Sequence, residues 1–142
     1  MKLRTILATK GAEVVTIQAN QTLKEAVTLL AQRKIGVLIV VDAAGALVGI
    51  LSERDVIREA ARHDDVLARP VSEAMTKSVI TGTPQDDVSS VMQTMTDRRF
   101  RHLPILDGGR LAGIISIGDL VKAQLDEYEG EIDSLQFQIT KG

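Results

Sequence analysis

The sequence contains no cysteine and no tryptophan, and aromatic residues make up only 2% of its 142 residues. Without cysteine the chain cannot form disulfides or use a thiolate nucleophile, although this absence does not distinguish cellular compartments. Aliphatic side chains and methionine must therefore fill the core. A platform of aromatic side chains, on which nucleic-acid bases could stack, is not available.

Charge and hydropathy exclude further classes of protein. The net charge is -2 at pH 7, whereas binding to a phosphate backbone usually requires a basic face. No apolar run approaches the roughly 18 residues that a membrane span needs, and residues 1–15 lack the apolar block and cleavage site of a signal peptide. We therefore expect a cytoplasmic protein that binds neither nucleic acid nor a membrane.

The chain contains an internal repeat. Residues 14–57 return as residues 79–121, with a one-residue deletion in the turn after Asp42. The identical pairs are Val14/Val79, Thr16/Thr81, Arg33/Arg98, Leu38/Leu103, Asp42/Asp107, Gly45/Gly109, Leu47/Leu111, Gly49/Gly113, Ile50/Ile114, Ser52/Ser116 and Asp55/Asp119. The segments before the two copies, LRTIL at 3–7 and VSEAM at 71–75, also match in pattern. A duplicated unit of this length predicts two copies of one supersecondary module.

Each copy is expected to fold as strand, helix, strand, strand, helix. Short β-branched runs predict the first strands, apolar residues at helical spacing predict the first helices, and two apolar runs around a glycine-containing loop predict a hairpin. The predicted elements are 14–17, 22–33, 37–42, 46–51 and a helix from Ser52 in the first copy, then 79–81, 86–98, 103–106, 111–115 and a helix from about Gly118. Residues 63–70 are the expected linker. One apolar sheet face per unit predicts that the two units pack about a pseudo-two-fold axis.

This arrangement resembles the tandem CBS (cystathionine beta-synthase) domain pair, also called a Bateman module. The resemblance runs from Leu3 to about Leu125 and rests on VSEAMT, RHLPILD and GIISIGDL in the second copy and on VLIVVD and GILSERDVI in the first. It implies an α+β fold of two β-α-β-β-α modules, at residues 1–64 and 65–125, with a helical extension at 126–142. It further implies a non-catalytic regulatory sensor. Its ligand would contain adenosine: AMP first, then ATP, ADP or NAD, or S-adenosylmethionine.

The chemistry centres on two Ser-x-x-Asp pairs, Ser52 with Asp55 and Ser116 with Asp119, each between a buried strand and a helix. One interpretation is a capping box, in which the serine and the acid cap the helix start. A carboxylate in the first helical turn can also accept both hydroxyls of a ribose, and a helix N-terminus supplies amide donors for phosphate. With the resemblance, this predicts ribose binding by Asp55 and Asp119 and phosphate contacts by Ser52 and Ser116.

A basic cluster precedes the second hairpin, at Arg98, Arg99, Arg101 and His102. Cations at a helix C-terminus complement its dipole, which accounts for Arg98 and Arg99. Arg101 and His102 instead enter the strand, where residues alternate between faces and both face solvent only at a cleft. The resemblance implies that this strand carries phosphate-binding side chains, so Arg101 and His102 are predicted phosphate ligands.

The first copy lacks these basic side chains, because Gly36 and Val37 stand at the positions that match Arg101 and His102. Arg54 is a predicted replacement for phosphate binding, since the second copy has Gly118 at the corresponding place. We therefore expect two unequal sites, one of which is empty or holds a different ligand.

Pro104 lies inside a predicted strand, where proline removes one hydrogen-bond donor from the ladder. An interrupted strand leaves backbone groups free to read adenine, although an edge-strand proline without a ligand role is the alternative. In the family, a cleft built on one module's aspartate takes its base-facing wall from the other module. The predicted adenine-facing residues are Gln18, Ala19, Ile35 and Gly36 with Ile114 at the Asp119 site, and Thr83, Pro84 and Phe100 with Ile50 at the Asp55 site.

An enzyme is the main competitor from another class. His63 and His102 are the only histidines, and no HExxH or P-loop motif accompanies them. Acidic pairs at 64–65 and 86–87 lie in polar connectors. We expect no catalytic residue, no metal and no catalytic cofactor. A structural interaction module with a decayed nucleotide site is the other alternative, but intact Ser-x-x-Asp pairs argue against it. We expect regulation to act on a separate target protein.

The tail beyond the second copy carries apolar residues at alternating steps of four and three, the spacing of an a/d seam on one helical face. These residues are Val121, Leu125, Tyr128, Ile132, Leu135 and Ile139. A homodimer through this helix is expected, with a helix folded back onto its own module pair as the alternative. Gly130 weakens the helix by about 1 kcal/mol and could mark a bend.

Overall fold

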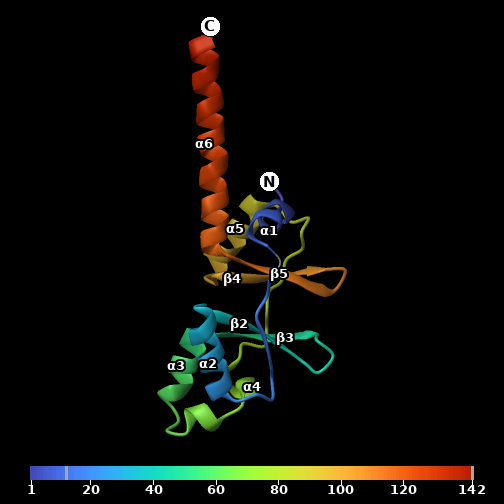
Figure 1. Ribbon diagram of the computed structural model, residues 1–142, viewed down its shortest axis with the longest axis vertical. Coiled ribbons are helices and arrows are strands. Elements are labelled where there is room, and N and C mark those ends of the chain that lie inside the picture. The colour runs from blue at the N-terminus through green and yellow to red at the C-terminus, as the bar shows by residue number, and fades with distance from the viewer. Residues whose placement is uncertain (12, 142) are drawn as a thin grey trace.

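The computed structural model describes residues 1–11 and 13–141. Two small modules follow one another along the molecule, and a long helix projects from the second (Figure 1). The elements are α1 (Leu3–Lys10), β1 (Thr16–Gln18), α2 (Leu23–Arg33), β2 (Val37–Val41), β3 (Leu47–Ser52), α3 (Glu53–Ala60), the 3-10 turn η1 (Val66–Ala68), α4 (Val71–Ala74), α5 (Val88–Arg98), β4 (His102–Asp107), β5 (Arg110–Ser116) and α6 (Ile117–Lys141). This mixed α+β architecture confirms the predicted fold class.

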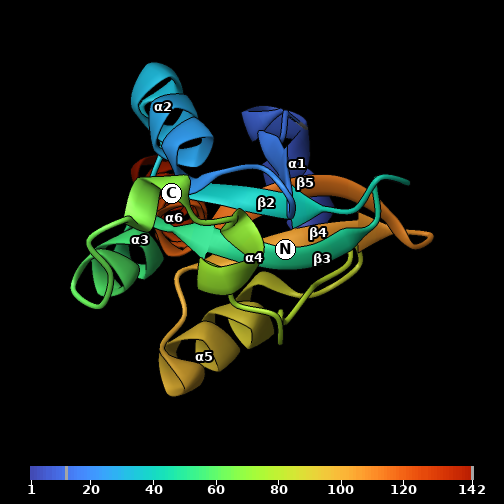
Figure 2. The ribbon, with the colours of Figure 1, turned by 90° about the horizontal axis from the view of Figure 1, so that it is seen from below.

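The two hairpins face each other across the middle of the molecule. Figure 1 shows β2–β3 opposite β4–β5, with α2, α3 and α4 beyond one hairpin and α1, α5 and α6 beyond the other. Seen along the long axis, the two hairpins overlie one another (Figure 2). In the first module β1 pairs parallel with β2, and β2 pairs antiparallel with β3. The second module has the antiparallel pair β4–β5.

The strand predicted at 79–81 is wrong, and Pro104 supplies the reason. In the first module the Ile39 N–H donates to the Val15 carbonyl at 3.2 Å. Pro104 occupies the equivalent position and has no N–H, so the matching bond to Ile80 cannot form. The segment stays beside β4 through a single bridge, in which the Gly82 N–H donates to the Pro104 carbonyl at 2.9 Å.

We call α1 and α4 the leading helices, because each precedes one repeat in the sequence. Each leading helix packs on the module formed by the other repeat. Leu3 and Ile6 of α1 are buried in the core of the second repeat, whereas Val71 and Ala74 of α4 are buried in the core of the first. The backbone bonds are reciprocal: the Leu3 N–H donates to Asp86 at 2.9 Å and the Val71 N–H donates to Gln21 at 2.8 Å. Packing therefore crosses the boundary between residues 1–64 and 65–125, which stays a prediction from sequence.

The repeated glycines Gly49 and Gly113 allow these helices to approach the hairpins. A Cβ on Gly113 would lie 2.6 Å from Leu7 Cδ2 of α1. A Cβ on Gly49 would lie 2.7 Å from Met75 Sδ and 3.0 Å from the Thr76 carbonyl, directly after α4. The distances of 2.6 and 2.7 Å are shorter than the contacts that a real Cβ makes, so each module has space for the other's leading helix only because this position lacks a side chain.

Gly49→Ala is expected to destabilise the fold more than Gly113→Ala. Overpacking typically costs about 1–3 kcal/mol, and the Cβ at position 49 meets backbone as well as a side chain. At position 113 the Cβ meets the end of one leucine, which can change its rotamer. Urea unfolding of both variants measures the difference. Equal losses would show that the backbone of Thr76 does not restrict position 49.

The helix α6 runs continuously from Ile117 to Lys141 and is straight along its length (Figure 1), so Gly130 does not mark a bend. Leu120 is buried in the second core, but the apolar residues from Leu125 onward are exposed. The helix therefore projects away from the modules (Figure 1) and does not fold back onto them. Within the described residues, no helix is both long and apolar enough to cross a membrane.

Candidate functional site

Both Ser-x-x-Asp pairs form capping boxes at helix starts. The Ser116 N–H donates to Asp119 Oδ2 at 2.8 Å, and the Asp119 N–H donates to Ser116 Oγ at 3.1 Å. The corresponding distances between Ser52 and Asp55 are 2.9 and 3.2 Å. The capping role is thus confirmed at both places. It fixes each carboxylate at the junction between a strand and a helix, while ribose binding stays a prediction.

The two carboxylates differ in access. Only 8% of the Asp55 side chain is exposed, and its Oδ1 accepts a bond from Arg58 Nη1 at 3.2 Å. The Asp119 side chain is 26% exposed. It borders a cavity of about 400 Å³ between α1 and α6, lined by Met1, Thr5, Ile6, Thr9, Lys10, Asp119, Lys122, Ala123 and Asp126. Asp119 is therefore the more accessible of the two predicted ribose ligands.

Lys10 contacts Asp119, a contact that the sequence did not predict. Its Nζ donates to Asp119 Oδ2 at 2.5 Å and to the Ile114 carbonyl at 2.8 Å. The exchange of leading helices places the end of α1 beside β5, which brings together residues 109 positions apart. The match between 3–7 and 71–75 marked these segments as equivalent, but it gave no indication of the module on which each one packs.

The first module has a different contact at the matching place. There Ile50 pairs with Thr76 through two backbone bonds, of 3.0 Å from the Ile50 N–H and 2.9 Å from the Thr76 N–H. The chain after α4 is extended, so its backbone reaches β3. At Ile114 the longer α1 places a lysine side chain there instead. The Asp119 site thus gains a cation where the Asp55 site has neutral backbone.

Neighbouring charges shift two ionisable groups at the Asp119 site. Burial alone would raise the pKa of Asp119, but the Lys10 ammonium and hydrogen bonds from Ser116 outweigh burial and lower this pKa. Burial lowers the pKa of His102, and the Lys10 and Arg101 cations lower this pKa further. Asp119 is therefore an anion at neutral pH, and His102 is poised to gain a proton if an anion binds nearby.

The lowered pKa of His102 predicts how stability depends on pH. Below its unfolded value of about 6.5, the unfolded chain binds more protons than the folded chain, so the free energy of unfolding falls as pH decreases through this window. We expect His102→Gln to reduce this dependence. Urea titrations between about pH 7.5 and 5.5 provide the measurement. An unaltered slope in His102→Gln would contradict the assignment.

The other predicted phosphate ligands lie around the same junctions. His102 is half-buried and pairs with Ser116 across β4 and β5. Arg101 is exposed, and its carbonyl accepts the Ile117 N–H at 2.9 Å. Arg54 is also exposed, in the first turn of α3. The structure brings Arg101 and His102 to the end of the second hairpin where Ser116 begins the turn into α6, three residues before Asp119.

The first module carries opposite charge at the place of Arg101. Gly36 stands there, and its carbonyl accepts the Glu53 N–H at 3.0 Å. A Cβ at Gly36 would lie 3.7 Å from Glu53 Cδ, so a carboxylate lies near a position where the second module has a guanidinium. The Asp119 site is consequently basic, whereas the Asp55 site combines Asp55 and Glu53 with Arg54 and Arg58.

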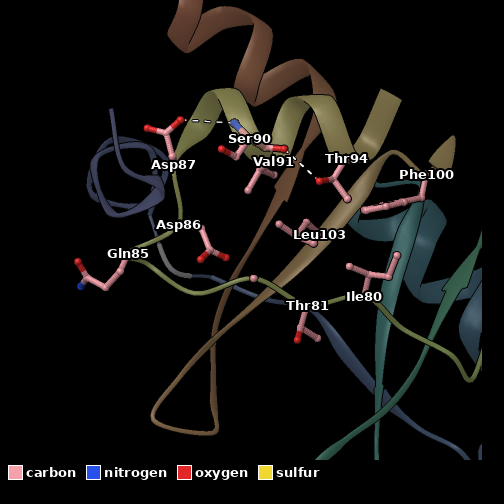
Figure 3. A pocket seen from close by; sticks show the side chains of 11 residues that line it. Ile80, Thr81, Gln85, Asp86, Asp87, Ser90, Val91, Thr94, Phe100 and Leu103 are labelled. Atoms are coloured by element: carbon pink, nitrogen blue, oxygen red, sulfur yellow. Dashed lines mark hydrogen bonds between the residues drawn. The ribbon is translucent and has the colours of Figure 1, made fainter. Parts of the chain in front are cut away.

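The predicted adenine-facing residues fall in several places. Phe100 borders a cavity of about 400 Å³ together with Ile80, Thr81 and Leu103 (Figure 3). Ile35 and Gly36 border another cavity, of about 550 Å³, within the first module. The remaining residues lie on the facing hairpins (Ile50 and Ile114), at the end of β1 (Gln18) or in connections (Ala19, Thr83 and Pro84). That these residues of one module face the aspartate of the other module stays a prediction.

Backbone contacts with the leading helices fix two of these residues. The Ala19 carbonyl accepts the Ser72 N–H at 3.0 Å, and the Pro84 carbonyl accepts the Arg4 N–H at 2.9 Å. Among the residues that the structure describes, no group of His, Cys, Asp and Glu side chains could hold a metal ion. The site is thus made of carboxylates, cations, hydroxyls and backbone groups, which suits a polar organic ligand.

Comparisons with known proteins identify similar proteins. The CBS-domain containing protein ATU1752 from Agrobacterium tumefaciens is 42% identical, with a TM-score of 0.83 over 87% of this chain and 99% of that chain. The CBS domain-containing protein YhcV of Bacillus subtilis is 36% identical over 82% of this chain and 83% of that protein. The CBS domain pair of protein MJ0100, solved in complex with 5′-methylthioadenosine and S-adenosyl-L-methionine, is 26% identical, with a TM-score of 0.77 over 89% of this chain and 98% of that chain.

The family model for the CBS domain matches the chain twice, at residues 5–62 and 71–126. Each match begins within a leading helix and continues through one repeat. Because the two matches together span most of the sequence, the chain belongs to the CBS domain family and contains the domain twice.

Proposed function

We propose that the protein is a non-catalytic regulatory sensor that binds an adenosine-containing ligand between its two CBS domains. The observation that carries this proposal is the carboxylate of Asp119 at a helix start, which is partly exposed, accepts a hydrogen bond from Lys10 and lies at the same end of the second hairpin as Arg101 and His102. A carboxylate suits the ribose hydroxyls, and the cations suit phosphate. The complex of the similar CBS domain pair of MJ0100 with methylthioadenosine and S-adenosylmethionine supports this ligand class.

At the Asp119 site, ribose replaces Lys10 as the partner of the carboxylate. The released ammonium then lies beside the phosphate, together with Arg101, His102 and the N-terminal amides of α6. Ser116 keeps its capping bond, and its hydroxyl donates a hydrogen bond to the phosphate. Gln18, Ala19, Ile35 and Gly36 of the first domain, with Ile114, form the proposed base wall. This basic setting favours an anionic ligand, AMP first and then ADP, ATP or NAD.

The Asp55 site is proposed to favour a less anionic adenosine compound. Glu53 lies near the position that Arg101 occupies in the second domain, and Arg58 already pairs with Asp55, which leaves Arg54 as the remaining phosphate ligand with Ser52. Its base wall is Thr83, Pro84 and Phe100 with Ile50. Ile80 lies next to Phe100 of this wall. Because Pro104 has no N–H to donate to the Ile80 carbonyl, this carbonyl is proposed to accept the adenine amino group.

A thermal-shift panel tests this function directly. Adenosine, AMP, ATP, NAD and S-adenosylmethionine are added to the full chain at millimolar concentration. A ligand that binds the native state stabilises it by RT ln(1 + [L]/Kd), about 2.7 kcal/mol at 100 times Kd. At least one adenosine compound is expected to raise the Tm, and guanosine compounds are expected not to. The absence of any shift would favour a structural interaction module without a ligand.

A sensor of this kind acts on a separate target protein, and we propose that it does so in the cytoplasm. Ligand binding between the domains changes how the two domains sit relative to one another, and such a change couples to a target only if the target distinguishes the two states. No step of this proposal requires a nucleophile, a general base or a metal, so the role is regulatory and not catalytic.

A further inference from the structure

We infer that α6 joins two copies of this chain in a parallel, in-register, two-stranded coiled coil. The helix carries six large apolar residues on one face, with exposed fractions from 45% at Val121 to 77% at Ile139. The complete set is Val121, Leu125, Tyr128, Ile132, Leu135 and Ile139. A row of exposed apolar side chains along one helical face marks an interaction surface, and spacing by four and three is that of a coiled-coil seam.

The residue types at the seam favour two parallel strands. If Leu125 is heptad position a, positions a are Leu125, Ile132 and Ile139, and positions d are Val121, Tyr128 and Leu135. β-Branched residues at a with leucine at d favour parallel dimers. Ile132, Leu135 and Ile139 follow this rule in the part of the helix that projects farthest from the modules (Figure 1). The occupant that matches the face is therefore an identical helix.

Flanking charges select the same orientation. Along the seam, positions g are Gln124, Glu131 and Gln138, and positions e are Lys122, Glu129 and Gln136. In a parallel in-register pair, position g faces position e of the next heptad on the other helix. Gln124 then faces the partner's Glu129, and Glu131 faces the partner's Gln136. Both of these pairs join one carboxylate with one neutral amide, and Lys122 at the remaining position e faces the partner's Ile117, so no like charges are opposed.

The antiparallel alternative opposes like charges. The antiparallel register that joins all six apolar layers is centred on Gly130, and it pairs Leu125 with the partner's Leu135. In that register Glu129 lies beside the partner's Glu129, and Glu131 beside the partner's Glu131. Opposed like charges are unfavourable, and they suppress the wrong pairing. Charge and residue type thus agree on the parallel arrangement, which places both second domains at the same end of the coil.

Cysteine cross-linking tests the orientation, because the natural chain contains no cysteine. In the parallel arrangement position 135 meets its own copy at disulfide distance. We expect Leu135→Cys to run as a disulfide-linked dimer after mild oxidation. Ser134→Cys, one residue off the seam, is the matched control and is expected to cross-link far less. Cross-linking only in a mixture of Leu125→Cys with Leu135→Cys would show an antiparallel pair and overturn the inference.

Sedimentation of variants without cysteine tests whether the seam is used at all. Ile132 is half exposed, so Ile132→Glu should leave each chain folded while it places charge in the seam. We expect a dimer for the natural chain at micromolar concentration, a monomer for Ile132→Glu and a dimer for the control Ser134→Glu. A monomeric natural chain, or a dimer that Ile132→Glu leaves intact, would overturn the inference. Neither outcome depends on whether the protein binds adenosine.

Discussion

Asp119→Asn is expected to weaken the binding of adenosine and of AMP alike, by roughly tenfold to a hundredfold in Kd. Both ligands carry the ribose hydroxyls, and a hydrogen bond to a charged group contributes about 1.5–3 kcal/mol. Asparagine keeps a carbonyl acceptor for the Ser116 N–H, so the start of α6 is retained while the charge is lost. Calorimetric titration of both ligands into natural and variant chains measures the effect.

Arg101→Ala is the matched contrast to this substitution. It removes a predicted phosphate ligand and leaves the carboxylate in place, so AMP binding should fall while adenosine binding stays nearly constant. Asp55→Asn reports on the other site in the same way as Asp119→Asn. An unchanged adenosine affinity in Asp119→Asn would contradict ribose binding at this carboxylate, because no other group at the site is proposed to accept both hydroxyls.

Lys10→Met is expected to change the binding of the two ligands in opposite directions. In the free protein Lys10 pairs with Asp119 and with the Ile114 carbonyl, so adenosine must displace a charged partner before its ribose can bind. Methionine removes that competitor, and adenosine should bind several-fold more tightly. AMP gains the same advantage but loses an ammonium beside its phosphate, a charge-assisted contact of about 1.5–3 kcal/mol, so AMP should bind more weakly.

Titration of both ligands into Lys10→Met and into a control lysine variant measures this reversal. Lys24→Met is the control, because Lys24 is exposed on α2 in the other domain. It should leave both affinities unchanged. If Lys10→Met shifted adenosine and AMP in the same direction, Lys10 would not distinguish a neutral ligand from an anionic one.

The repeat made much of this architecture predictable from sequence. Two apolar runs around a short loop gave the hairpins, and the doubled Ser-x-x-Asp pairs gave both capping boxes at the correct residues. These features depend on local periodicity and on side chains three positions apart. Such short-range interactions are encoded directly in neighbouring residues.

The features that the sequence did not predict depend on contacts between distant residues. The missing strand at 79–81 follows from one absent N–H at Pro104, which matters because Ile39 makes the matching bond in the first domain. The contact between Lys10 and Asp119 requires α1 to pack on the second core. The straight course of α6 at Gly130 shows that a cost of about 1 kcal/mol for glycine is too small to end a long helix.

The most direct test of the central claim is a calorimetric titration of AMP, with GMP as the control, into the natural chain and into a chain that carries both Asp55→Asn and Asp119→Asn. We predict binding heat for AMP with the natural chain, little or none for GMP, and loss of the AMP signal in the double variant, which should remain folded by its thermal melt. If no adenosine compound released or absorbed heat at millimolar concentration, or if the folded double variant bound AMP as tightly as the natural chain does, the claim that these two aspartates hold an adenosine ligand would be contradicted.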